Sequence, residues 1–179
     1  MTLIVNYFGG PCAGKSTMAG GIFNKLKSVG YDVEYVQEFA KTLTWEKNYE
    51  GLKHQSYVTG VQMYTQNMLL NQVQVVITDS PILIGLMYYN ESSPKIKWAF
   101  ETFVIESFKA QNNINFFIKR NDYYTNVGRR RTKEEAIKID ERIQQLFQEN
   151  NIQYHTIDAN NDGLEVSLKL VLETLNKEI

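Results

Sequence analysis

The chain has 179 residues, of which 43% are apolar, and its formal net charge is −1. A chain of this length and composition can bury a hydrophobic core as one domain spanning residues 1–179. The near-neutral charge argues against a protein whose main task is to coat long nucleic acid. Because Cys12 is the only cysteine, no disulfide can form within the chain, which indicates a reducing compartment.

The sequence has neither the basic start and apolar stretch of a secretory signal nor an apolar run of membrane-spanning length. We therefore expect a cytoplasmic protein without membrane contact, or a protein of the host cell cytoplasm if the gene is viral. The sequence leaves both a monomer and a homodimer open.

Apolar runs alternate with helical patterns along the chain, which predicts an α/β fold with a doubly wound, five-stranded parallel sheet. Strands are expected at residues 2–8, 32–37, 73–78, 114–118 and 153–157. Helices are expected at residues 15–29, 55–70 and 95–111, after a capping box at 132–135, and after a loop at 158–163. Shorter helical segments are expected within residues 39–49 and 82–89.

Two of these helices have an apolar face that we expect to be buried. On the helix over residues 95–111, the predicted face consists of Ile96, Phe100, Phe103, Val104 and Phe108. On the last helix, the residues expected to point inward are Val166, Leu170 and Leu175.

The first predicted strand leads directly into a phosphate-binding loop of the pattern G-x-x-x-x-G-K-[ST]. Glycines let the backbone curl so that successive N–H groups face one anion. Lys15 adds positive charge for the outer phosphates, the Ser16 hydroxyl can ligate the accompanying Mg²⁺, and the following helix presents its positive end. A turn without chemical meaning is the alternative, which the flanking strand and helix disfavour. The residues expected to bind a nucleoside triphosphate are Gly9, Gly10, Pro11, Cys12, Ala13, Gly14, Lys15, Ser16 and Thr17.

Glu38 ends the second predicted strand and should face the same crevice as Gly9. A carboxylate there can accept a proton from an attacking hydroxyl or anchor a sugar hydroxyl. The alternative is a solvated glutamate at a helix start, where the dipole favours it.

Gln62 lies on the predicted helix over residues 55–70, among several aromatic and glutamine residues. Its amide is a candidate for reading the base of a substrate by paired hydrogen bonds. The alternative is that this residue belongs to the core.

Asp79 directly follows the β-branched third strand, as a Walker B aspartate does. A carboxylate there can hold Mg²⁺ opposite Ser16, whereas the alternative is an N-cap for the next helix. Ser80 stands where motor ATPases place a water-activating glutamate, so the sequence does not favour hydrolysis. A guanine signature Asn-Lys-x-Asp is also absent from the sequence.

A basic segment over residues 119–133 follows the fourth predicted strand and includes Arg129, Arg130 and Arg131. Arginines on a loop at the crevice can close over the triphosphate and neutralise the charge of the transferring group. We expect at least one of the three to contact phosphate, with Arg129 and Arg130 as catalytic candidates. Arg120 is expected to stack on the nucleotide base. A solvated surface segment is the alternative.

In this order, the residues resemble the small P-loop kinases, a superfamily that includes thymidylate kinase, the deoxynucleoside kinases and nicotinamide riboside kinase. The resemblance covers nearly the whole chain. It rests on residues 9–17, Glu38, Asp79-Ser80-Pro81, Gly128-Arg129-Arg130-Arg131 and residues 154–159. Glu38-Phe39-Ala40-Lys41 together with Ile77-Thr78-Asp79-Ser80-Pro81 looks most like a kinase-like group often encoded by bacteriophages.

The resemblance implies that Glu38 handles the acceptor hydroxyl and that the loop with Asp158, Ala159 and Asn160 cradles the adenine. Ser80 stands where thymidylate kinase has an arginine, and the Glu-Arg-Ser motif of the deoxynucleoside kinases is absent. The resemblance therefore does not name the acceptor.

These observations predict a phosphotransferase that uses ATP and Mg²⁺ and acts on a nucleoside or nucleotide. A kinase that acts on nucleic acid, at a 5′ end or on a hydroxymethylated base, is one alternative. An ATP-responsive binding or regulatory module is another. The missing glutamate after Asp79 and the arginine-rich segment favour transfer over switching.

Overall fold

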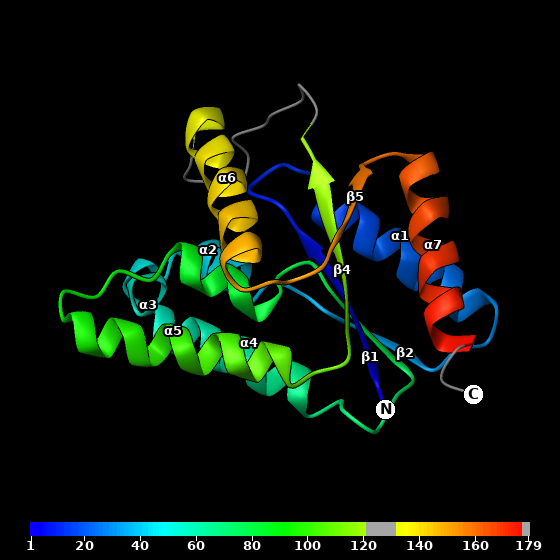
Figure 1. The fold of residues 1–179 in the computed structure, drawn as a ribbon, viewed down its shortest axis with the longest axis horizontal. Helices are drawn as coiled ribbons and strands as arrows, with labels where there is room; N and C mark the ends of the chain where they lie inside the picture. The colour runs from blue at the N-terminus through cyan, green and yellow to red at the C-terminus, as the bar shows by residue number, and fades with distance from the viewer. Residues whose placement is uncertain (121–131, 177–179) are drawn as a thin grey trace.

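A five-stranded parallel sheet forms the centre of the molecule (Figure 1). The computed structural model describes residues 1–120 and 132–176. The strands are β1 (Leu3–Phe8), β2 (Val33–Val36), β3 (Val75–Thr78), β4 (Asn113–Lys119) and β5 (His155–Asp158). They lie in the order β2-β3-β1-β4-β5, and every neighbouring pair is parallel. The predicted α/β fold with a doubly wound sheet is confirmed.

Helices connect the strands and cover both faces of the sheet (Figure 1). They are α1 (Lys15–Ser28), α2 (Phe39–Trp45), α3 (Tyr49–Lys53), α4 (Gln55–Asn67), the 3₁₀ helix η1 (Ile82–Met87), α5 (Pro94–Lys109), α6 (Lys133–Glu149) and α7 (Asn161–Asn176). The predicted capping box is present, because Thr132 and Glu135 exchange hydrogen bonds with each other's backbone N–H groups. In the described parts of the chain, no helix has the length and apolar character needed to cross a membrane.

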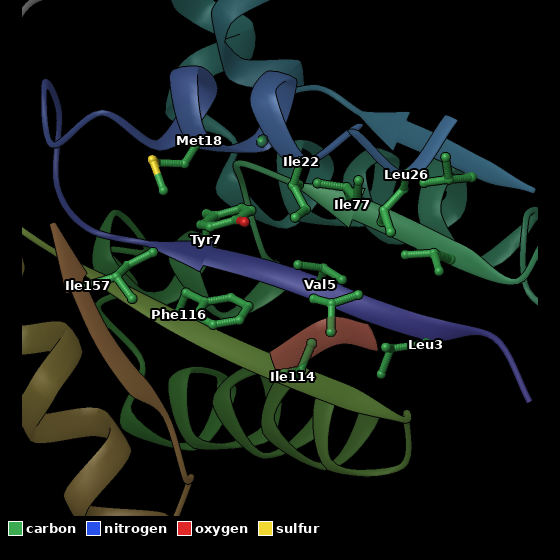
Figure 2. Packing of buried hydrophobic residues seen from close by; sticks show 14 of the residues in the cluster. Leu3, Val5, Tyr7, Met18, Ile22, Leu26, Ile77, Ile114, Phe116 and Ile157 are labelled. Atoms are coloured by element: carbon green, nitrogen blue, oxygen red, sulfur yellow. The ribbon is translucent and has the colours of Figure 1, made fainter. Parts of the chain in front are cut away.

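One face of the sheet packs against α1 and α7. Alternate residues of the strands point to this face, as the two-residue period of a strand requires. Figure 2 shows Met18, Ile22 and Leu26 of α1 above the side chains of the sheet. Tyr7 and Phe116, from neighbouring strands, stack with their ring centroids 5.4 Å apart. The central strand β1 is buried along its whole length.

The opposite face of the sheet is covered by η1, α5 and α6, and its core is rich in aromatic rings. Phe8, the last residue of β1, meets Phe147 of α6 edge-on at 4.7 Å and Phe108 of α5 at 6.1 Å between ring centroids. The two cores meet at β1, which contributes Leu3, Val5 and Tyr7 to the first and Phe8 to the second.

The prediction that three apolar residues lie in the core is wrong. Ile96 and Phe103 of α5 are 54% and 58% exposed, and Val166 of α7 is 47% exposed. Helical spacing defines an apolar stripe but not which of two adjacent stripes faces the sheet. On α5 the stripe with Val104 and Phe108 is buried. On α7 the small residues Gly163 and Ser167, with Val171, are buried instead.

The strand order predicts a crevice beyond the carboxyl ends of β1 and β3. The chain leaves β1 through α1 on one face of the sheet, and it leaves β3 through η1 and α5, which cover the other face. Where connections diverge in this way, the carboxyl ends of neighbouring strands leave room for a ligand. Residues that follow β1 and β3 therefore meet at one point.

We predict that Phe147→Ala lowers the free energy of unfolding by about 3–5 kcal/mol, because it empties a fully buried site against Phe8 and Tyr154. Denaturant unfolding measures the change. As a control, Phe103→Ala on the exposed side of α5 should change stability by about 0.5 kcal/mol or less. A similar loss in both variants would mean that the rings around Phe8 do not form the core of this face.

Candidate nucleotide site

The phosphate loop joins β1 to α1 and depends on backbone conformations that suit glycine. Gly14, the residue before α1, has a φ of 99°, and a Cβ there would lie 2.5 Å from the Cβ of Ala159. Cys12 also has a positive φ, 62°. Because Gly14 has no side chain, it cannot cap the first N–H groups of α1. A helix start without a side-chain cap is suited to binding an anion such as phosphate.

Ser16 and Asp79 meet beyond the carboxyl ends of the neighbouring strands β1 and β3. The Ser16 hydroxyl donates a hydrogen bond of 2.5 Å to Oδ2 of Asp79. Asp79 does not cap η1, whose N-cap residue is Pro81, so the N-cap interpretation is wrong. The carboxylate is buried, and Oδ1 has no hydrogen-bond partner among the described residues. A hydroxyl beside a buried carboxylate with one unsatisfied oxygen fits a Mg²⁺ ion, which prefers oxygen ligands.

Lys15 interacts electrostatically with four charged residues of the site, Glu38, Asp79, Arg120 and Asp140. Its Nζ donates to the backbone oxygen of Gly10 at 3.0 Å. Burial lowers the pKa of Lys15, while the negative charges of Glu38, Asp79 and Asp140 oppose that shift. Three carboxylates from different parts of the chain therefore stabilise the positive charge of one lysine.

Glu38 occupies the N-cap position of α2, but its side chain does not accept a cap hydrogen bond from that helix. The carboxylate is half-buried and acts electrostatically on Lys15. Glu38 therefore lies near enough to Lys15 of the phosphate loop to act on its charge, and its predicted role at the acceptor stays a prediction.

Gln62 is buried, and its amide bonds to backbone on both sides of Glu38. Oε1 accepts from the Phe39 N–H at 3.0 Å, and Nε2 donates to the Gln37 oxygen at 3.3 Å. Nε2 also lies 3.5 Å from Oγ1 of Thr78, the residue before Asp79. The predicted contact of Gln62 with a substrate base stays a prediction. In this structure its amide holds the backbone around Glu38.

Arg120 and Asp140 form a buried ion pair against the phosphate loop. Nε of Arg120 lies 2.6 Å from Oδ2 of Asp140, and Nη1 donates to the Pro11 oxygen at 2.7 Å. Oδ1 of Asp140 accepts from the Gly10 N–H at 2.5 Å. The predicted stacking of Arg120 on a base stays a prediction, and its guanidinium is already engaged on two sides.

The loop after β5 lies beside the phosphate loop. Asp158 is the last residue of β5 and pairs in register with Lys119 of β4. Ala159 follows it and approaches Gly14 closely enough that only glycine fits there. This neighbourhood suits the predicted adenine-binding role of Asp158 and Ala159. Arg129 and Arg130, the candidates of the basic segment, lie outside the described residues.

Two residues of the site, Asp140 and Tyr35, are missed by the sequence interpretation. Tyr35 of β2 faces Asp79 and Ser16, and burial together with the charge of Asp79 raises the pKa of its phenol. Asp140 gives a detectable signal, because it interrupts the buried face of α6 formed by Ala136, Ile139, Ile143 and Phe147. An acidic residue on such a face needs a buried partner.

The family model described as an AAA domain matches residues 4–162 of the chain. A search of the curated proteins found no match to the chain. Among solved structures, the thymidylate kinase from Ehrlichia chaffeensis is 16% identical with a TM-score of 0.64, over 97% of this chain and 98% of that chain. The deoxyadenosine kinase from M. mycoides, with the products dCMP and a flexible dCDP bound, is 16% identical with a TM-score of 0.58, over 98% and 100%. These likenesses show that the chain has a P-loop fold like that of thymidylate kinase.

We predict that Lys15→Met raises the free energy of unfolding of the protein without nucleotide. The folded-state pKa of Lys15 lies below its unfolded value, so the cost of the charge is fully present below the folded-state pKa. That cost fades as the pH rises toward the unfolded value, and the advantage of Lys15→Met should shrink over the same range. Denaturant unfolding at neutral and alkaline pH measures both effects.

Lys95→Met, at an exposed position of α5, is the matched control and should show no such pH-dependent gain. A Lys15→Met variant that is less stable than the wild type at neutral pH would contradict a burial cost for this charge.

Proposed function

The chain belongs to the AAA domain family, and on that premise we propose that it is an ATP-dependent phosphotransferase acting on a nucleoside or nucleotide. The observation that carries the proposal is the contact of Asp79 with Ser16 of the phosphate loop, together with the Gln62 amide that bonds on both sides of Glu38 and reaches Thr78 beside Asp79. One carboxylate then serves the donor side of the crevice and the other the acceptor side. The likeness to a thymidylate kinase and a deoxyadenosine kinase supports this class of acceptor.

On the donor side, the phosphate loop and the first turn of α1 would bind the triphosphate of ATP. Lys15 would leave the Gly10 oxygen and neutralise charge on the outer phosphates. Ser16 and Asp79 would hold Mg²⁺, which lowers the charge repulsion between the phosphates and an attacking oxygen. Ala159, beside Gly14, would lie close to the nucleoside of ATP.

On the acceptor side, Glu38 would accept the proton of the attacking hydroxyl of a nucleoside. With a nucleotide acceptor, whose attacking phosphate oxygen carries no proton, Glu38 would instead anchor a sugar hydroxyl. As the attacking oxygen bonds to the γ-phosphorus, the bond from the γ-phosphorus to the β–γ bridging oxygen breaks and ADP leaves. The Gln62 amide supports this role, because its two backbone bonds flank Glu38 and limit where the carboxylate can move. Ser80 follows Asp79 in place of a water-activating glutamate, which favours transfer over hydrolysis.

The direct test incubates the protein and Mg²⁺ with ATP labelled at the γ-phosphate, against nucleosides, nucleotides, and plain or hydroxymethylated DNA oligomers. We expect label on a free nucleoside or nucleotide, and none with Lys15→Met. Label only on oligomers would instead assign a kinase that acts on nucleic acid. If no acceptor is labelled and none changes the turnover of ATP, the chain is an ATP-responsive module and the proposal fails.

We predict that Glu38→Gln lowers kcat for transfer to a nucleoside hydroxyl by about 10²–10⁴-fold, because an amide cannot take up the proton. The affinity for ATP should change little, since Glu38 is placed on the acceptor side. Steady-state kinetics with varied acceptor, together with ATP titration, measure both. Glu46→Gln, at the exposed end of α2, is the control with the same chemical change. Unchanged turnover with unchanged acceptor KM would remove Glu38 from the mechanism.

A further inference from the structure

We propose that Asp140, paired with Arg120, is a positioning residue that fixes the shape of the phosphate loop for ATP without itself touching the nucleotide. The inference rests on the nucleotide site of the proposed function. It adds a residue of α6, far from the phosphate loop in sequence, to the determinants of ATP affinity.

The pair holds the loop through its backbone. Both oxygens of the buried Asp140 carboxylate are used, Oδ1 by the Gly10 N–H at 2.5 Å and Oδ2 by Arg120 at 2.6 Å. Arg120 in turn donates to the Pro11 oxygen at 2.7 Å. The N–H of residue 10 and the C=O of residue 11 are therefore fixed from outside the loop by charge-assisted hydrogen bonds, which are stronger than neutral ones.

The absence of a side chain at Gly10 allows α6 to pack directly on the loop. A Cβ at Gly10 would lie 2.6 Å from the carbonyl oxygen of Ala136, one helical turn before Asp140. It would also lie 3.2 Å from Oδ1 of Asp140 and 3.0 Å from Nη2 of Arg120. The backbone of α6, its Asp140 and the loop thus form one close contact.

The pair also acts on Lys15. The charge of Asp140 raises the pKa of Lys15 and that of Arg120 lowers it, so the pair acts on Lys15 with opposing charges. Both backbone polar groups of Gly10 are hydrogen-bonded. Its N–H donates to Asp140, and its carbonyl oxygen accepts from Lys15. When Lys15 turns to a phosphate, the Asp140 bond still holds Gly10 in place.

Helix packing alone does not account for this pair. The buried positions of α6 around it are Ala136, Ile139, Ile143 and Phe147, and an apolar residue at position 140 would continue that face. Burying a carboxylate and a guanidinium has a large desolvation cost, so a buried ion pair is weak support for stability. What the pair supplies and an apolar residue cannot is a set of hydrogen bonds to the loop.

The test compares Asp140→Asn, Arg120→Lys and the double variant with wild type and with Glu141→Gln, an exposed control on α6. Isothermal titration with Mg·ATP gives Kd, and circular dichroism confirms that each variant is folded at the temperature of the titration. We expect Asp140→Asn to raise Kd about tenfold, as loss of a charge-assisted hydrogen bond does. The KM for ATP should rise with it, while the acceptor KM stays unchanged.

Because the two residues act as a unit, the double variant should lose little more than the weaker-binding single variant. A folded Asp140→Asn protein that binds Mg·ATP as tightly as Glu141→Gln overturns the inference. If Asp140→Asn does not fold, Arg120→Lys decides, since it keeps the charge beside Asp140 but lacks the planar fork that reaches both Asp140 and Pro11. An unchanged Kd for Arg120→Lys then overturns it. Failure of phosphate transfer by the wild type would instead defeat the proposed function and leave this inference standing.

Discussion

The organisation of the nucleotide site follows from one partly buried charge, the amino group of Lys15. A lysine in such a position loses hydration and is retained in its charged form only if negative groups surround it. Those groups are Glu38, Asp79 and Asp140, which come from the ends of β2 and β3 and from α6. A parallel sheet brings Glu38 and Asp79 together because the carboxyl ends of its strands share one edge, whereas Asp140 arrives with α6, which packs on Gly10. The fold therefore supplies the counter-charges that no local segment around Lys15 contains.

Three carboxylates near a triphosphate site create a second problem, since they repel the ligand that Lys15 attracts. The negative charge of each carboxylate has a different neutralising partner. Asp140 is paired with Arg120 at 2.6 Å. In the proposed mechanism Asp79 would be neutralised by Mg²⁺, and Glu38 by the proton of the acceptor. The three acidic residues are thus not interchangeable, and replacing one should not reproduce the effect of another.

A feature of this chain can be predicted from the sequence when the interactions that determine it lie within a short segment. The phosphate loop is contained in nine residues, and the buried strand before Asp79 is readable from its β-branched residues, so both could be predicted. The Ser16–Asp79 contact could be predicted as well, because strand order brings the two loops together. Gln62 is different, because the sequence around it does not reveal that its amide hydrogen-bonds to the backbone on both sides of Glu38. Which side of α5 faces the sheet was likewise decided by tertiary packing, which left Ile96 and Phe103 exposed.

The phosphate loop is held in shape on two flanks, and this affects what nucleotide binding costs. On one flank α6 packs against Gly10, and on the other Ala159 packs against Gly14, with both contacts close enough to exclude a Cβ. A loop that was free before binding would lose conformational entropy when ATP arrived, and that loss would weaken the affinity. Here the ordering accompanies folding, because the contacts that impose it are made by the protein itself. Glycine at these two positions therefore serves the packing of the flanks as much as the curvature of the loop, which is a requirement that the motif alone does not state.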